Sequence, residues 1–107
     1  PHPRGYGTFS RVIRKYVNET SILSIEEAIY KMTGFPAQTL GLKDRGILKE
    51  GFFADITIFD QETIAEQATF TSPHNYSTGI KHVLVNGKLT INDGKHESVT
   101  NGAILKK

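Results

Sequence analysis

The spacing of apolar residues changes near Leu42, and this change constrains the fold more than any other feature of the sequence. Before it, apolar side chains recur every three or four residues, which is typical of amphipathic helices. After it, short β-branched and aromatic runs alternate with turn residues, which is typical of strands. We therefore predict an α+β fold, with helices in residues 1–42 followed by antiparallel strands in residues 43–107.

The first predicted helix begins at Thr8, whose hydroxyl is suited to capping it. Three cationic residues, Arg11, Arg14 and Lys15, fall on the polar side and are interpreted as a solvated helix face rather than a phosphate site. The predicted apolar stripe of this helix comprises Phe9, Val12, Ile13, Tyr16 and Val17.

A second helix is predicted after Ser24, which forms a capping box with Glu27. It should end at Gly34, and Pro36 then suits the first position of a further short helix, where a backbone N–H is not needed. The apolar face of the second helix is predicted to contain Ile25, Ala28, Ile29 and Met32.

Strands are predicted at residues 47–50, 53–60, 80–85 and 88–91, with a possible edge strand at 103–105 and a loop over 61–79. Asn86-Gly87 predicts a two-residue type I′ turn, because both turn positions need a positive φ. The hairpin should end at residues 92–94. The predicted register places Leu84 opposite Leu89, Val85 opposite Lys88, His82 opposite Ile91 and Val83 opposite Thr90.

The residue types present exclude several classes of chemistry. Cysteine is absent and the four histidines lie at positions 2, 74, 82 and 96, so no two have the helical spacing of metal ligands. We predict no metal or cofactor bound by this chain itself. The 13 Lys and Arg against 11 Asp and Glu give no basic surface for nucleic acid. No apolar run or leader indicates a membrane span or export, so a cytoplasmic location is predicted.

The polar residues that stand out also have structural interpretations. His74 and His96 fit solvated loops, and His82 fits a rim position bonded to a backbone carbonyl. Glu26 and Glu27 complement the positive end of the second helix. Two further carboxylates, Asp55 and Asp60, flank a predicted strand and fit backbone-bonded positions at its ends.

The order of these segments resembles the amidohydrolase superfamily. The matching features are the helix of residues 24–33, a Pro-Ala-x-x-Leu-Gly-Leu segment at 36–42, and a Gly-x-x-Ala-Asp-apolar run at 51–56. Within that superfamily, residues 2–12, 44–46, 68–73 and 79–87 are most similar to the N-acyl-D-amino-acid deacylases (D-aminoacylases).

This resemblance implies the fold and activity of a longer enzyme. The helices would belong to the end of a TIM-type (β/α)₈ barrel, and the strands to half of a small β-sandwich. The family hydrolyses the amide of N-acyl-D-amino acids with zinc and an Asp base, which the resemblance places on barrel strands outside this chain. No catalytic or metal-binding residue is therefore carried over, and only His2 and Arg4 are implied to approach the substrate.

The sequence begins with Pro1 rather than Met. This adds to the expectation that the chain is a piece of a longer enzyme and that the piece is inactive alone. The missing half of the sandwich would leave apolar surface uncovered, so we expect the isolated chain to self-associate. The alternative is an independent, non-catalytic binding module that shares ancestry with the amidohydrolases. An upstream barrel in the native gene would favour the first interpretation.

Overall fold

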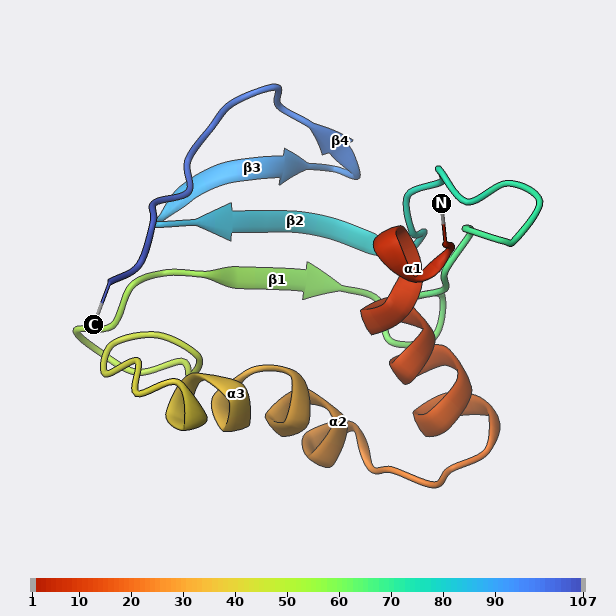
Figure 1. Ribbon diagram of the computed structural model, residues 1–107, viewed down its shortest axis with the longest axis horizontal. Helices are drawn as coiled ribbons and strands as arrows, with labels where there is room; N and C mark the ends of the chain where they lie inside the picture. Colours follow the sequence, from red (N-terminus) through yellow and green to blue (C-terminus); the bar gives the residue numbers. More distant parts are fainter. Residues whose placement is uncertain (1, 107) are drawn as a thin grey trace. The chain divides into compact units, whose positions relative to one another are not determined.

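The structure is a computed structural model that describes residues 2–106. The elements, in chain order, are α1 (Arg4–Arg11), η1 (Val12–Glu19), α2 (Ile25–Met32), α3 (Gly34–Thr39), β1 (Ile56–Phe59), β2 (Ile80–Val85), β3 (Lys88–Asn92) and β4 (Lys95–His96), as Figure 1 shows. Helices followed by an antiparallel sheet confirm the predicted α+β class.

The chain divides into two compact units, which are described separately. The first contains the residues up to Ala28 together with Phe59–Ile80, and the second contains Ile29–Ile58 and the residues from Lys81 onward. The predicted boundary between residues 42 and 43 concerns the origin of the two parts in a longer enzyme, and it stays a prediction.

In the first unit, the helix begins at Arg4 rather than at Thr8, so the predicted cap is wrong. Thr8 lies inside α1, where its hydroxyl donates to the Arg4 carbonyl at 2.8 Å. Small residues allow a close approach by the rest of the unit, and the buried face is therefore formed by Gly7 and Ser10. Phe9, predicted to face the core, is 67% exposed.

The helix continues as η1, a π-helix whose backbone bonds reach five residues back, as from Thr20 N–H to the Lys15 carbonyl. This wider winding turns side chains relative to an α-helix. As a result Ile13 and Val17 are buried as predicted, whereas Tyr16 is exposed.

The capping box at the start of α2 is confirmed. Ser24 Oγ accepts from the Glu27 N–H at 3.1 Å, and the Glu27 carboxylate accepts from the Ser24 N–H at 3.2 Å. On the predicted apolar face, Ala28 is fully buried. Pro36 occupies the third position of α3 rather than the first, and it is tolerated there because the first helical turn needs no intrahelical N–H bonds.

The four strands form one sheet in the order β1-β2-β3-β4 (Figure 1). β1 and β2 run antiparallel, since Asp60 N–H donates to the Gly79 carbonyl at 2.8 Å beyond one end and Gly87 N–H donates to the Ala54 carbonyl at 2.9 Å beyond the other. The turn between β2 and β3 is confirmed, with φ of 53° at Asn86 and 77° at Gly87.

The predicted register of this hairpin is half correct. Next to the turn, Leu84 lies opposite Leu89 and Val85 opposite Lys88, as expected. Beyond them a bulge makes Thr90 an extra residue, which shifts every later pair by one. His82 therefore lies opposite Asn92 and Val83 opposite Ile91, in place of the predicted pairs.

Other strand predictions also need correction. Residues 92–94 end the hairpin as predicted, since β3 ends at Asn92. Asp93 and Gly94, with φ of 50° and 81°, then make a second tight turn into β4, a strand that was not predicted. Residues 47–50 and 103–105 are not strands, because no described segment pairs with them, and Leu48 and Ile104 are 80% and 90% exposed. His82 Nδ1 accepts from the Asp93 N–H at 3.3 Å, rather than the ring donating to a carbonyl.

The buried apolar residues are few and mostly small. They are Ile13, Val17, Ala28, Ala37, Ile64 and Ala68. Two of them, Ile64 and Ala68, belong to the predicted 61–79 loop, which contributes no strand to the sheet but buries these two side chains. Many large apolar side chains stay exposed, including Phe70 and Tyr76 at 78% and 75%. Among residues 2–106 no helix is both long and apolar enough to cross a membrane.

Candidate functional site

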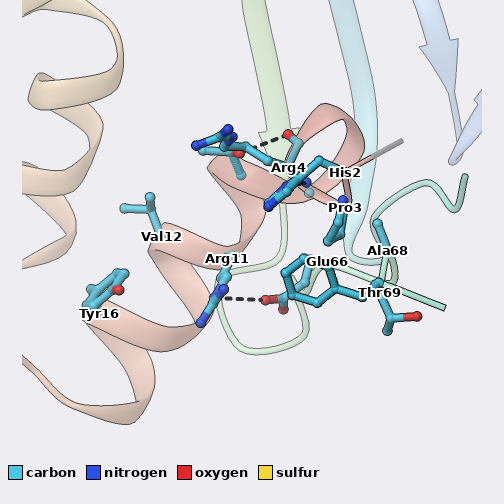
Figure 2. A pocket seen from close by; sticks show the side chains of 12 residues that line it. His2, Pro3, Arg4, Arg11, Val12, Tyr16, Glu66, Ala68 and Thr69 are labelled. Atoms are coloured by element: carbon cyan, nitrogen blue, oxygen red, sulfur yellow. Dashed lines mark hydrogen bonds and ion pairs between the residues drawn. The ribbon is translucent and has the colours of Figure 1, made fainter. Parts of the chain in front are cut away.

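The first unit contains a pocket of about 490 Å³ beside α1 and η1 (Figure 2). One side is formed by the helical segment and the other by the 61–79 loop. The lining residues are His2, Pro3, Arg4, Gly7, Thr8, Arg11, Val12, Tyr16, Glu66, Ala68, Thr69 and Phe70. Both candidate substrate residues named from the sequence, His2 and Arg4, are thus brought to the same pocket.

His2 is held by two contacts at the start of α1. Its Nδ1 accepts the Arg4 backbone N–H at 3.0 Å, and its ring packs edge-on against Phe70 with the ring centroids 5.0 Å apart. Because Nδ1 is an acceptor, the neutral imidazole carries its hydrogen on Nε2. His2 therefore accepts the first N–H of α1 through Nδ1 and has Nε2–H as its donor.

Arg4 is the first residue of α1 and is exposed. A cation at this end of a helix is not stabilised by the helix dipole, which favours negative charge there. The position therefore suits an anionic ligand, which the guanidinium and the helix end would both attract.

Glu66 is the carboxylate of the pocket, and only 15% of its side chain is exposed. Arg14 binds it in a bidentate manner through Nε and Nη2, the latter at 3.0 Å. Arg11 Nε lies 3.6 Å from the same carboxylate, as the dashed line in Figure 2 shows. The hydrogen bond from Arg14 lowers the pKa of Glu66, against burial, which raises it. Arg14 also pairs with Glu19. Two cations of the predicted solvated face, Arg11 and Arg14, thus take part in an ion-pair cluster while their side chains stay partly exposed.

This cluster depends on the close approach of α1 to the loop at Gly7. A Cβ built on Gly7 would lie 2.8 Å from the Glu66 Cβ, a distance that requires one of them to move. Arg14 and Glu66 could not be paired from sequence patterns, because 52 residues separate them. No local pattern singled out Glu66, which shares the aperiodic loop with a second glutamate, Glu62.

Two rings of the loop pack against a tyrosine of α1. The Tyr6 ring packs against His74 and Tyr76, with ring centroids 5.5 and 5.4 Å apart. His74 is exposed in its loop, as predicted, although its ring has this partner.

A second polar network lies in the other unit and has a structural role. Arg45 contacts Asp55 and Asn86, and Asp55 also accepts the Asn86 backbone N–H at 2.9 Å. Burial raises the pKa of Asp55, but the Asn86 N–H and Arg45 outweigh it and the pKa is lowered overall. The strand-end carboxylates are thus backbone-bonded as predicted, and Asp60 likewise accepts the Glu62 N–H at 2.9 Å.

Within residues 2–106, no three side chains of His, Cys, Asp or Glu gather in a way that could hold a metal ion. The pocket lining has a single carboxylate, that of Glu66, and two arginines already pair with it. The described residues therefore do not fit a zinc ion.

Comparison with known proteins places the chain in a family. The model of the amidohydrolase family matches residues 1–91. The chain belongs to the amidohydrolase family. It is 49% identical over 87 residues to an N-acyl-D-glutamate deacylase of Alcaligenes xylosoxydans xylosoxydans, a match that covers 81% of this chain and 18% of that enzyme. The family resemblance described from the sequence is confirmed.

Solved structures of family members agree with this assignment. A crystal structure of D-aminoacylase superposes with a TM-score of 0.96 and 38% identity, covering 100% of this chain and 23% of that chain. The N-acyl-D-glutamate deacylase of Bordetella bronchiseptica, solved with zinc and a phosphonate mimic of the tetrahedral intermediate, gives a TM-score of 0.83 and 40% identity, over 95% of this chain and 22% of that one. The amidohydrolase segment described here thus spans about a fifth of these relatives.

We expect Gly7→Ala to destabilise the first unit by about 1–3 kcal/mol, because the new methyl group overlaps the Glu66 side chain. Gly5→Ala is the matched control on the same helix, since a Cβ there has no neighbour within 4 Å. Its stability should be unchanged or raised by up to about 1 kcal/mol. Chemical denaturation of both variants measures the difference, and equal destabilisation would contradict the close approach.

Glu66→Gln should destabilise the protein most at neutral pH. A carboxyl whose pKa is lower in the folded than in the unfolded state stabilises the fold at pH values above its ordinary pKa of 4.5. This contribution is lost as the pH falls through the folded pKa. The difference in unfolding free energy between wild type and variant should therefore shrink on acidification. Glu62→Gln, in the same loop but exposed, serves as the control. A gap that stays constant with pH would disprove the role of the ionised carboxylate.

Proposed function

We propose that this chain is the C-terminal segment of a zinc-dependent enzyme that hydrolyses the amide of N-acyl-D-amino acids, and that it is inactive alone. The observation that carries the proposal is the TM-score of 0.96 over 100% of this chain against only 23% of D-aminoacylase. The 49% identity to an N-acyl-D-glutamate deacylase supports the same substrate class.

In this proposal the pocket of the first unit forms one wall of the substrate site. Every N-acyl-D-amino acid carries an α-carboxylate, which a guanidinium binds with two parallel N–H donors. Arg4 lines the pocket at the positive end of α1 and is the proposed partner of that carboxylate. His2, whose Nδ1 is engaged by the Arg4 N–H, presents Nε2–H as a second donor.

Arg14, one of the two arginines paired with Glu66, would act indirectly. Arg14 is bound to Glu66 and so does not compete for the substrate anion. The same ion pair holds η1 against the loop, and η1 continues the helix that carries Arg4. Arg14 and Glu66 are therefore proposed as positioning residues for Arg4.

The zinc of the proposed enzyme would be held by segments outside this chain, since the described residues offer no site for it. In such enzymes the metal polarises the amide and activates water. Residues 1–42 are proposed to complete the end of the barrel and residues 43–107 to form half of the small β-sandwich. The rest of the enzyme would cover exposed apolar side chains such as Phe9 and Phe70, and without it the chain would self-associate.

Expression of the native reading frame tests the proposal. The protein with its upstream sequence and zinc should hydrolyse N-acetyl-D-glutamate or N-acetyl-D-methionine and spare the L-enantiomers, whereas residues 1–107 alone should give no turnover. Turnover by the short chain that survives repurification would overturn its proposed inactivity. A native gene that encodes these residues alone would instead favour the binding module.

Arg4→Ala in the zinc-loaded longer enzyme should lower kcat/KM by roughly 10- to 100-fold, since a hydrogen bond to a charged group contributes about 1.5–3 kcal/mol. Arg4→Lys should recover only part of the loss, because an ammonium does not reproduce the bidentate geometry. Lys15→Ala, a cation on η1 that does not line the pocket, is the control. Equal activities of Arg4→Ala and Lys15→Ala would rule out the proposed role of Arg4.

A further inference from the structure

Two Asn-Gly pairs in the second unit have the same local sequence but different surroundings. They are Asn86-Gly87 and Asn101-Gly102. In such a pair the backbone nitrogen of the glycine can attack the side-chain carbonyl carbon of the asparagine, because glycine has no side chain to obstruct the approach. Whether the attack occurs in a folded protein depends on whether that N–H is free to leave its hydrogen bond.

At Asn86-Gly87 both reacting groups are engaged. The Gly87 N–H donates to the Ala54 carbonyl at 2.9 Å. The Asn86 side chain is fixed from two sides, since its Oδ1 accepts from Arg45 at 2.7 Å and its Nδ2 donates to the Asn101 carbonyl at 2.7 Å. This pair is therefore protected by the fold.

A related pair, Asp93-Gly94, is protected in a similar way. Gly94 N–H donates to the Lys81 carbonyl at 2.9 Å, so its nitrogen is held away from the Asp93 side chain. Both tight turns of the sheet thus use the glycine N–H in the backbone network.

At Asn101-Gly102 the nitrogen has no such restraint. Gly102 lies outside the strands and is exposed, and within residues 2–106 no acceptor engages its N–H. A Cβ built on Gly102 would have no neighbour within 4 Å, so the surrounding space is open. The Asn101 side chain is anchored through its nitrogen alone, to Thr90 Oγ1 at 3.1 Å and weakly to the Leu89 carbonyl at 3.4 Å.

We propose that Asn101 is a site of spontaneous deamidation and that it reacts selectively over Asn86. The Gly102 nitrogen forms a bond to Asn101 Cγ, the bond from Cγ to Nδ2 breaks, and ammonia leaves with the proton from the Gly102 N–H. Water then opens the resulting five-membered imide at one of its two carbonyls. The products are aspartate or isoaspartate at position 101, with no change in oxidation state.

The reaction would remove a contact that supports the β3 bulge. Asn101 Nδ2 donates to the hydroxyl of Thr90, the extra residue of that bulge, and a carboxylate in its place cannot donate. The carboxylate would keep the contact only by drawing that hydroxyl away from the Lys88 carbonyl, to which it donates at 3.4 Å. The new negative charge would also face the Leu89 carbonyl oxygen. Deamidation therefore loosens the attachment of β4, whose neighbour Glu97 bonds to the Thr90 carbonyl at 2.9 Å.

Peptide mapping by mass spectrometry of the purified protein, aged at mildly alkaline pH, tests the proposal. The peptide with Asn101 should convert to the acid and isoaspartyl forms roughly tenfold or more faster than the peptide with Asn86, because release of Gly87 first requires local opening. In denaturant the two rates should become similar. Equal rates in the native protein, or a slow Asn86 that stays slow in denaturant, would overturn the proposal.

Two variants test the deamidation of Asn101 and the loosening of β4 separately. Gly102→Ala should slow conversion of Asn101 several-fold without altering that of Asn86, since the added methyl group obstructs the attack. Asn101→Asp, which reproduces one product, should speed hydrogen exchange at Glu97, whereas Asn18→Asp in the other unit should not. Unchanged exchange in Asn101→Asp would contradict the proposed loosening of β4.

Discussion

The ion pair between Arg14 and Glu66 is the interaction on which the first unit and its pocket depend. A carboxylate that is only 15% exposed needs a partner of opposite charge, because burial without one is costly. Arg14 supplies two parallel donors and lowers the pKa of Glu66. The pair joins the helical segment to a loop 52 residues later, and Gly7 is the residue that lets the two come close enough.

The second unit depends instead on the turn at Asn86. Its positive φ and that of Gly87 set the turn, and its side chain joins Arg45 to the segment that contains Asn101. The same contacts that fix the sheet also protect Asn86 from chemical change. Asn101, with the same following residue, lacks these contacts at Gly102 and is the proposed reactive site. Reactivity here is decided by hydrogen bonding of a backbone nitrogen rather than by sequence.

The small core and the many exposed apolar side chains fit the place of this chain in its family. The buried apolar residues in 2–106 are all alanine, valine or isoleucine, while the four tyrosines and four of the six phenylalanines are exposed. The amidohydrolase relatives are more than four times as long, since the matched residues span 18% and 23% of those compared. The pocket has an arginine at a helix end, and no three potential metal ligands gather among residues 2–106. It is therefore proposed as a substrate wall, with the chemistry proposed to lie elsewhere in the enzyme.

The sequence by itself determined the features that depend on neighbouring residues. The capping box at Ser24, the tight turn at Asn86-Gly87, the α+β order and the family resemblance all follow from local patterns. The resemblance also implied a substrate role for His2 and Arg4, which line one pocket and whose role stays a proposal. Only the tertiary structure decided the buried face of α1, the bulge at Thr90 and the partner of Arg14. These depend on contacts between distant segments: small residues admitted the loop beside Gly7, Asn101 engaged Thr90 at the bulge, and Glu66 came within reach of a helix far earlier in the chain. Spacing along a chain carries no information about which distant segment will fill such a space.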